Sequence, residues 1–491
     1  MPVIKTSTYA PATKDESHQV YNGLDCCITL EVLRELKSLH PVNPQVYNFA
    51  LALQAPALEM MQRGFLIDKI SAQNSIKECE EKILFLQEVL DEFAVAVWGK
   101  PLNPRSPTQL IKFFYEAMKL PEVWTSKKGV RKLSTDREAL ETLELYFIAR
   151  PIIRTILAIR DIGKQLSVLQ TEVDYDGRMR TSYNIAGTET ARWSSSSSST
   201  GTGTNLQNIA PKLRNIFIAD PGWKLCGIDL EQAESREVGW LCGVLFDDWT
   251  YLDACYAGDL HTLVCKYAWP ELKWTGDKKE DRAIADSVFY REYSYRDMAK
   301  KLGHGSNYRG LPPTMARHAK IETYIAENFQ RNYFKAFQGI PKYHRWVAEQ
   351  LQVSQKVTTV FGRTRHFFGR PNDDTTLREA IAYAPQSATG DRLNLALWRI
   401  WHTLGDSIRL TAQVHDAVYF QYKEEDEGWI ISKALSLIET PLHHNGRTLI
   451  VPGEAKVGWN WGNYSPANPE GLMKYKGKDE RKRTTSLNRI L

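Results

Sequence analysis

The feature of this sequence that most constrains its fold is a pair of short apolar segments separated only by His415 and Asp416. Residues 408–414 and 417–422 are rich in β-branched and aromatic residues, so they are predicted to be two strands joined by a tight turn. Residues 223–229 form a third such segment, which also ends in an aspartate. The chain is therefore expected to build a sheet that presents two carboxylates at strand ends.

Most of the remaining sequence predicts helices around this sheet. Helices are expected over the following ranges, the first of them broken at Gly64: 45–95, a stretch ending near 166, 231–242, 245–350 and 377–404. Residues 357–368 are strand-like with a turn at Gly362, and residues 194–204, almost entirely Ser, Thr and Gly, favour a flexible loop. Residues 127–132 are expected to form a basic loop. No internal repeat is found, and the expected fold class is α+β, with one antiparallel sheet flanked by helical lobes.

Length and composition are those of an ordinary globular chain. At about 150 residues per domain, 491 residues suggest roughly three domains or one multilobed enzyme. Hydrophobic residues make up 43% and charged residues 25%, which excludes wholesale disorder. The net charge is +5, and residues 471–491 carry seven Lys or Arg against two acids, so residues 1–470 sum to zero. Bulk charge therefore does not predict a nucleic-acid partner for the body of the chain.

Cysteine usage and hydropathy indicate a cytoplasmic protein. The seven cysteines include no pair with the two-residue gap of a zinc knuckle or a redox motif, which favours a reduced, intracellular chain. No apolar run approaches the ~20 residues needed to span a membrane. The N-terminus has no signal-type apolar segment and carries Asp15 and Glu16, unlike a transit peptide. We therefore expect no membrane partner.

The two strand-end aspartates, Asp229 and Asp416, are candidate metal ligands. Two-metal phosphoryl transfer needs such a pair, because the carboxylates bridge Mg²⁺ ions that activate the attacking hydroxyl and stabilise the leaving group. Each aspartate also has a purely structural interpretation. Asp229 could cap the following helix, and Asp416 could fill the hairpin turn.

A second candidate set lies on one predicted helix. Arg296, Lys300, His304 and Tyr308 recur at every fourth position and therefore share one broad helical face. Two cations, an imidazole and an aromatic ring suit a triphosphate at one end and a base at the other. The alternative is a solvated basic helix. Glycines at 303 and 305 weigh against it, since each costs up to ~1 kcal/mol in a helix and favours a close approach or a hinge.

These residues resemble the motifs of family A DNA polymerases, the class of bacterial DNA polymerase I. Residues 229–236 resemble motif A, residues 296–308 motif B and residues 413–416 motif C, in the family's order. Lesser signatures support them: Thr190–Ser195 with Asn205–Ile209, Asp259 with His261, Arg378 with Gln386, Glu454 with Gly458, Asn460 and Trp461, and the thumb pattern Pro56, Arg63-Gly64, Ile67-Asp68 and Ser106-Pro107. The resemblance covers about residues 45–464.

The resemblance implies a right-hand polymerase fold, with an antiparallel palm sheet and a helical thumb and fingers. The implied division of the chain is a remnant of an exonuclease-like domain at 1–44, thumb at 45–180, palm at 181–244 and 355–465, fingers at 245–354, and a flexible basic tail at 466–491. The tail is expected to be an accessory that touches duplex DNA or a partner.

The resemblance also implies a role for each site residue. Asp229 and Asp416, with the Leu230 carbonyl, would bind two Mg²⁺ ions, with Mn²⁺ able to substitute, and Lys300 would protonate the departing pyrophosphate. Glu234 would exclude a ribose 2′-hydroxyl. Further contacts to the deoxyribonucleoside triphosphate would come from Gln232, His261, Arg296, Lys300, His304 and Tyr308. Contacts to the primer–template would come from Arg192, Gln207, Asn208, Arg236, Arg378, Gln386 and His415.

The sequence departs from the family pattern at several positions. His304 stands where Phe or Tyr is usual, which puts dideoxynucleotide discrimination in doubt, and Arg309 stands where Gly is usual. Ala382 and Ala417 replace a frequent Asn and a frequent acid. The unusual motif B, together with the incomplete exonuclease pattern described next, is more typical of a viral or phage enzyme, which would act in the host cytoplasm.

The N-terminal segment resembles only part of a proofreading domain. Tyr21–Asp25 resembles the last motif of the exonuclease domain that usually precedes this polymerase, but residues 1–20 contain no D-x-E pair. No active proofreading exonuclease is therefore expected in this chain. A separate exonuclease, a helicase or a clamp is a candidate partner.

The expected function is template-directed DNA synthesis. One alternative is a single-subunit RNA polymerase of related fold, against which Glu234 argues. The other is a non-catalytic DNA-binding or processivity subunit, against which the retention of Asp229, Asp416, Arg296 and Lys300 argues.

Overall fold

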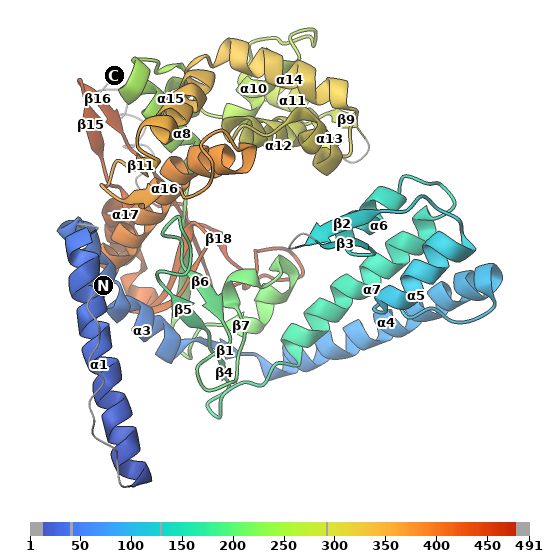
Figure 1. Cartoon of the computed structure of the whole chain (residues 1–491), viewed down its shortest axis with the longest axis horizontal. Helices are drawn as coiled ribbons and strands as arrows, with labels where there is room; N and C mark the ends of the chain where they lie inside the picture. The colour runs from blue at the N-terminus through green and yellow to red at the C-terminus, as the bar shows by residue number, and fades with distance from the viewer. Residues whose placement is uncertain (1–12, 40–42, 128–129, 291–292, 478–491) are drawn as a thin grey trace.

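The structure, a computed structural model, describes residues 13–39, 43–127, 130–290 and 293–477. A long helical arm and a compact helical lobe lie on two sides of a central sheet (Figure 1). The expected α+β class is confirmed. Among the described residues, no helix combines the length and the apolarity that crossing a membrane requires. All seven cysteines are unpaired.

The central sheet has five antiparallel strands in the order β13-β14-β8-β17-β18. Their bounds are β8 (Lys224–Leu230), β13 (Ile408–Val414), β14 (Ala417–Tyr422), β17 (Gly453–Gly458) and β18 (Met473–Lys474). The predicted hairpin is confirmed with both of its strands. His415 adopts a φ of +54°, a left-handed conformation that lets a two-residue turn reverse the chain.

Alternate side chains of a strand point to opposite sides of a sheet, and here both sides are covered by packed side chains. Val418 and Phe420 pack on one side with Ile228, in a core that includes the long helix α16 (Asp374–Leu404) and α17 (Glu427–Ile438). Tyr419 packs on the other side against Trp461. The sheet is therefore held rigidly between two layers.

The compact lobe consists of helices packed on one apolar core. It follows α8 (Ala233–Phe246) and contains α9 (Thr250–Tyr256), α10 (Leu260–Ala268), α11 (Lys278–Ala285), the short strands β9 (Val288–Tyr290) and β10 (Tyr293–Ser294), α12 (Tyr295–Asn307), α13 (Pro312–Ala319), α14 (Thr323–Ala336) and α15 (Gly339–Val353). The chain then returns to the sheet through the hairpin of β11 (Lys356–Thr358) and β12 (Thr364–His366), as the strand-like pattern there predicts.

The arm is built on a pair of long helices, α4 (Lys69–Trp98) and α7 (Arg150–Leu169). Smaller elements cover its tip: α5 (Pro107–Ile111), the π-helical turn η1 (Lys112–Ala117) and α6 (Arg137–Leu143). The basic loop expected at 127–132 is instead the hairpin of β2 (Trp124–Lys127) and β3 (Val130–Leu133). Backbone pairing overrides the loop composition there, and Lys128 and Gly129 themselves lie outside the described residues.

The base of the arm and the edges of the sheet are made of short elements. They are α2 (Pro44–Ala52), α3 (Gln54–Arg63), β1 (Phe65–Ile67), β4 (Arg178–Met179), β5 (Ser182–Asn184), β6 (Ser194–Ser196), η2 (Leu206–Asn208), η3 (Pro211–Ile216), β7 (Phe217–Ile218) and η4 (Glu424–Asp426). The hairpin of β15 (Leu442–His444) and β16 (Arg447–Leu449) instead contacts α8 and α9, where Arg447 pairs with Asp253 over 3.0 Å. The flexible loop expected at 194–204 is wrong at its start, because residues 194–196 pair with β5. The rest of that segment closes a turn through Ser198 and Thr202.

Both ends of the described chain differ in character. The helix α1 (Lys14–Leu39) extends away from the body (Figure 1). At the other end, the flexible tail expected from residue 466 is wrong at its start, because β18 pairs with β17 and Leu472 is buried. The predicted basic residues from Lys478 onwards lie outside the described residues.

Candidate active site

Asp229 and Asp416 lie side by side in the central sheet. Asp229 is the register partner of Ala417, the residue after Asp416, and the Leu230 N–H donates to the Asp416 carbonyl over 3.1 Å. The helix-cap interpretation of Asp229 is wrong, because Gln232 is the N-cap residue of α8 and no side chain caps that helix. The two carboxylates therefore share one end of the sheet.

A third carboxylate stands on the next strand. Glu454 of β17 is the register partner of Asp229 on its other side, and its side chain pairs with Lys474 over 3.0 Å. Although Asp229 is exposed, the surrounding protein removes part of its hydration, and this desolvation, followed by the charge of Asp416, raises the pKa of Asp229 to about 6. Such crowding of acids favours a bound cation.

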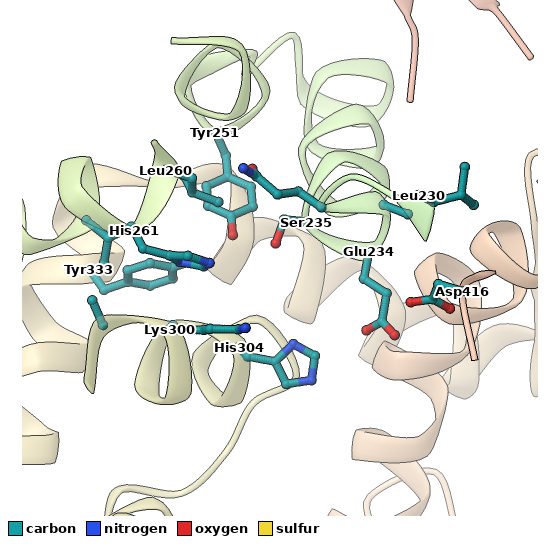
Figure 2. A pocket seen from close by; sticks show the side chains of 15 residues that line it. Leu230, Glu234, Ser235, Tyr251, Leu260, His261, Lys300, His304, Tyr333 and Asp416 are labelled. Carbon is teal, nitrogen blue, oxygen red and sulfur yellow. The ribbon is translucent and has the colours of Figure 1, made fainter. Parts of the chain in front are cut away.

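Arg192 supplies a positive charge that partly neutralises these acids. Its Nη2 donates to Asp416 Oδ1 over 3.1 Å and also to Glu234 Oε1. Burial opposes the charged guanidinium, but Asp416 and Glu234 together raise the pKa of Arg192. Figure 2 shows the carboxylates of Glu234 and Asp416 next to each other. The residue expected to contact the primer–template therefore bridges the acids in this structure, because like charges so close need a counter-ion.

The four-residue periodicity around Arg296 matches one face of α12. The helix begins at a capping box formed by Ser294 and Asp297, which fixes its first turn. Lys300 and His304 face a cavity of 330 Å³, across which lie Glu234 and Asp416 (Figure 2). The solvated-helix alternative is therefore not supported for this face.

The end of α12 reaches the acids directly. Tyr308, its C-terminal cap residue, donates its hydroxyl to Glu234 Oε2, and the His304 ring packs edge-on against Tyr308 at 5.0 Å. Burial, then the Glu234 charge, raises the pKa of Tyr308. A Cβ at Gly305 would lie 2.6 Å from the sulfur of Met315. Gly305 thus permits α13 to approach α12 closely, as expected from the sequence for a glycine in this helix.

Arg296, at the start of α12, is held by an acid. Its Nε and Nη2 donate to the two carboxylate oxygens of Asp259 over 2.9 and 3.1 Å. His261, two residues after Asp259, lies in the cavity with Lys300 (Figure 2). Burial, then the nearby Arg296, lowers the pKa of His261 to about 4, so its imidazole is neutral at physiological pH.

The structure brings together most of the predicted substrate residues. Five of them line the cavity: Gln232, Glu234, His261, Lys300 and His304. The predicted metal ligands Leu230 and Asp416 line it too, whereas Asp229, Arg296 and Tyr308 do not. Three further polar lining residues, Ser235, Tyr251 and Tyr333, were not predicted. The two tyrosines are connected through Asn307, whose side chain donates to Tyr251 and accepts from Tyr333. Tertiary packing brings Tyr251, Asn307 and Tyr333 together from distant parts of the sequence. A local sequence pattern therefore could not predict that they meet.

The predicted DNA contacts are more dispersed. Gln207 donates to the Gln413 side chain over 2.9 Å, whereas Asn208 and His415 are exposed. Arg378 pairs with Asp374 over 3.3 Å, and Gln386 is half-buried on α16.

The DNA contact implied for Arg236 is not supported. The residue is 6% exposed, stacks on Tyr256 and donates to the Glu231 carbonyl over 3.1 Å. Arg236 is the fourth residue of α8, and its side chain faces inward there. Arg236 therefore fixes the junction of β8 and α8, close to Asp229.

Comparison with known proteins identifies what this site resembles. The sequence profile of DNA polymerase family A matches residues 73–463. DNA polymerase I of Caldicellulosiruptor bescii is 28% identical over 427 residues, which is 82% of this chain and 45% of the relative. Thermostable DNA polymerase I of Thermus aquaticus is 26% identical over 430 residues, covering 83% of this chain and 46% of the relative. The chain thus spans about half the length of these curated relatives.

A solved structure shares the fold. It is the POL domain of Pol1 from M. smegmatis, in complex with a DNA primer–template and dNTP, with a TM-score of 0.68 and 24% sequence identity. The match covers 88% of this chain and 71% of that chain. The expected right-hand fold is thereby confirmed.

Proposed function

The chain belongs to DNA polymerase family A, and from this premise we propose that it extends a primer 3′ end with deoxyribonucleotides, directed by a DNA template, and releases pyrophosphate. One observation supports this most: Asp229 and Asp416 share one end of the sheet, and Lys300 of α12 faces Asp416 across a cavity. A nucleotide bound there would have its triphosphate near Lys300 and its reacting phosphorus near the acids.

The donor set fits Mg²⁺. Carboxylates and a backbone carbonyl are hard oxygen ligands, and Mg²⁺ is usually bound by one or two carboxylates together with substrate phosphates. In the part of the chain that the structure describes, no group of three His, Cys, Asp or Glu side chains could hold a metal alone, so substrate oxygens would complete the shell. We propose that Asp229, Asp416 and the Leu230 carbonyl hold two Mg²⁺ ions, with Mn²⁺ able to substitute. Bound there, the ions would activate the primer hydroxyl and neutralise developing charge.

The protein side chains have distinct tasks in this proposal. Arg296 and Lys300 would bind the triphosphate, and neutral His261 could donate one hydrogen bond to it. The Lys300 ammonium would pass a proton to the departing pyrophosphate. Gln232 and His304 would line the nucleotide, and Tyr308 would stack near the templating base.

DNA binding requires Arg192 to leave the acids. The Arg192 guanidinium between Asp416 and Glu234 occupies the place that a metal ion would take. A metal ion would compete with it for the carboxylates, and the primer–template would compete with the carboxylates for the guanidinium. We propose that Arg192 then turns to the primer terminus, and that Gln207, Asn208, Arg378, Gln386 and His415 contact the duplex. Contacts of this kind to backbone and minor groove tolerate any sequence.

The proposed division of labour follows the lobes. We assign the thumb to 45–180, the palm to 181–244 and 355–465 and the fingers to 245–354, acting in the cytoplasm. The end of α15 at Val353 and the start of β11 at Lys356 support the boundary between fingers and palm at residues 354 and 355. Residues 1–44 remain a proposed exonuclease-like remnant.

The test is primer extension with deoxyribo- or ribonucleotides, using the wild type and Glu234→Ala. The wild type should add only the deoxynucleotide complementary to the template. Tyr308 holds the Glu234 carboxylate in place, and removing that carboxylate opens space for a 2′-hydroxyl. Ribonucleotide incorporation should therefore rise by about tenfold or more in the variant.

The control is Glu271→Ala, which removes an exposed carboxylate outside the cavity and should leave the sugar preference unchanged. Preferential use of ribonucleotides by the wild type would support the RNA polymerase alternative. Primer–template binding without any extension would support the non-catalytic subunit.

A further inference from the structure

Two arginines share the carboxylate of Asp259. Its Oδ2 accepts from Arg296 Nε and from Arg282 Nη1, each over 2.9 Å, and from the Thr262 hydroxyl over 2.7 Å. Its Oδ1 accepts from Arg296 Nη2 over 3.1 Å. Four hydrogen bonds from three residues thus converge on one acid.

The two arginines come from different elements and differ in exposure. Arg296 lies in the first turn of α12, one turn before the cavity residue Lys300, and 25% of its side chain is exposed. Arg282 lies on α11, where 46% of its side chain is exposed, and its Nε donates to Asp286 one turn further on. The bond to Asp286 fixes the guanidinium so that Nη1 points at Asp259.

This arrangement matters because Arg296 has two competing anions. The Arg296 guanidinium pairs with both carboxylate oxygens of Asp259, whereas its proposed task is to bind a triphosphate. Moving Arg296 to the phosphates would leave Asp259 as a partly buried carboxylate, and an uncompensated charge of this kind is costly. A second cation that stays on Asp259 lowers that cost.

We propose that Arg282 is a positioning residue that keeps Asp259 compensated, so that Arg296 can transfer from Asp259 to an incoming nucleoside triphosphate. The inference rests on the proposed function, since it assigns Arg296 to the triphosphate. It concerns the strength of nucleotide binding and not the chemical step, because the Arg282 guanidinium bonds to Asp259 and Asp286, neither of which lines the cavity.

The experiment compares Arg282→Gln, Arg282→Lys and wild type. Equilibrium binding of dATP is measured by calorimetry with Mg²⁺ and a dideoxy-terminated primer on its template, and KM and kcat for dATP are measured by extension of a normal primer. Arg282→Gln should weaken dATP binding and raise KM by about three- to fivefold, as expected for a partly exposed charge, with kcat within about twofold of wild type. Arg282→Lys should restore both, since Arg282 gives Asp259 a single N–H.

Two further variants sharpen the result. Arg331→Gln removes an exposed arginine of α14 and should change nothing. In an Asp259→Asn background, the Arg282→Gln substitution should have no further effect on dATP binding, because no carboxylate remains to be compensated.

The outcomes separate the two proposals. Unchanged dATP affinity in Arg282→Gln, or a fall in kcat at unchanged KM, would overturn the role of Arg282. A wild type that binds dATP yet never extends a primer would overturn the proposed function, while the Arg282 comparison would still be measurable by calorimetry. Loss of dATP affinity in Arg282→Gln that Arg282→Lys fails to restore would also count against this role.

Discussion

The charged residues around the sheet edge form one connected set. Arg192 joins Asp416 to Glu234, and Tyr308 joins Glu234 to the end of α12. A residue from each of four distant stretches of sequence thus meets at one point. Neutralisation here is local, which explains how a chain of zero net charge over residues 1–470 can still place cations where phosphates would bind.

A second charged pair lies entirely inside the molecule. Arg392 of α16 donates to Glu237 of α8 over 2.8 and 2.9 Å and also to the Thr440 carbonyl, and both partners are 0% exposed. Arg392→Leu would leave Glu237 buried and unpaired, so the free energy of unfolding in urea should fall by about 3–5 kcal/mol. The double variant with Glu237→Leu should recover most of the loss. A loss below about 1 kcal/mol in the single variant would contradict this account.

The pH dependence of that variant has a defined sign. Burial raises the pKa of Glu237 above its ordinary value of 4.5, and Arg392 opposes the rise. Without Arg392, the pKa of Glu237 should be higher still. A raised folded pKa contributes stability below pH 4.5 that is lost as the pH rises through the folded value. The deficit of Arg392→Leu should therefore shrink as the pH falls towards 4.5.

Among the elements, α1 differs most from the rest. None of its described side chains is buried, and its exposed large apolar residues are Tyr21, Leu24, Ile28, Leu30, Val32, Leu33 and Leu36. Deletion of residues 1–39 should therefore leave the urea midpoint of the remaining chain unchanged. All 14 tryptophans lie beyond this segment, so their fluorescence reports the same transition in both proteins. A clearly lowered midpoint would show that α1 stabilises the body.

Element prediction succeeded where local pattern decides the structure. The hairpin around His415 and Asp416 was predictable because apolar strands and a two-residue turn are local features, and the face of α12 because helical spacing is. The inward direction of Arg236, the pairing of residues 194–196 and the packing of Leu472 were not, since each depends on distant partners. Likewise, Asp259 was only part of a motif until the structure placed two arginines on it.

In the whole molecule, the central sheet lies between the arm and the compact lobe and connects them (Figure 1). The two faces of its inner strands are buried, and the end of the sheet at Asp229 and Asp416 carries the acids. The arm and the compact lobe also meet directly, because Lys320 at the end of α13 pairs with Glu144 after α6 over 3.2 Å. The lobes that would bind primer–template and nucleotide are thus connected both through the sheet and by this ion pair.

In the proposed function, Asp229 and Asp416 hold the metal ions on which nucleotide addition depends. The most direct test is single-turnover primer extension by Asp416→Ala with Mg²⁺, alongside Asp406→Ala, an exposed aspartate in the turn before β13, as the control. Asp416→Ala should lose about a thousandfold or more in rate, because the metal contribution is several kcal/mol, and should bind primer–template within a few-fold of wild type. Extension at the rate of the control would contradict the assignment of Asp416.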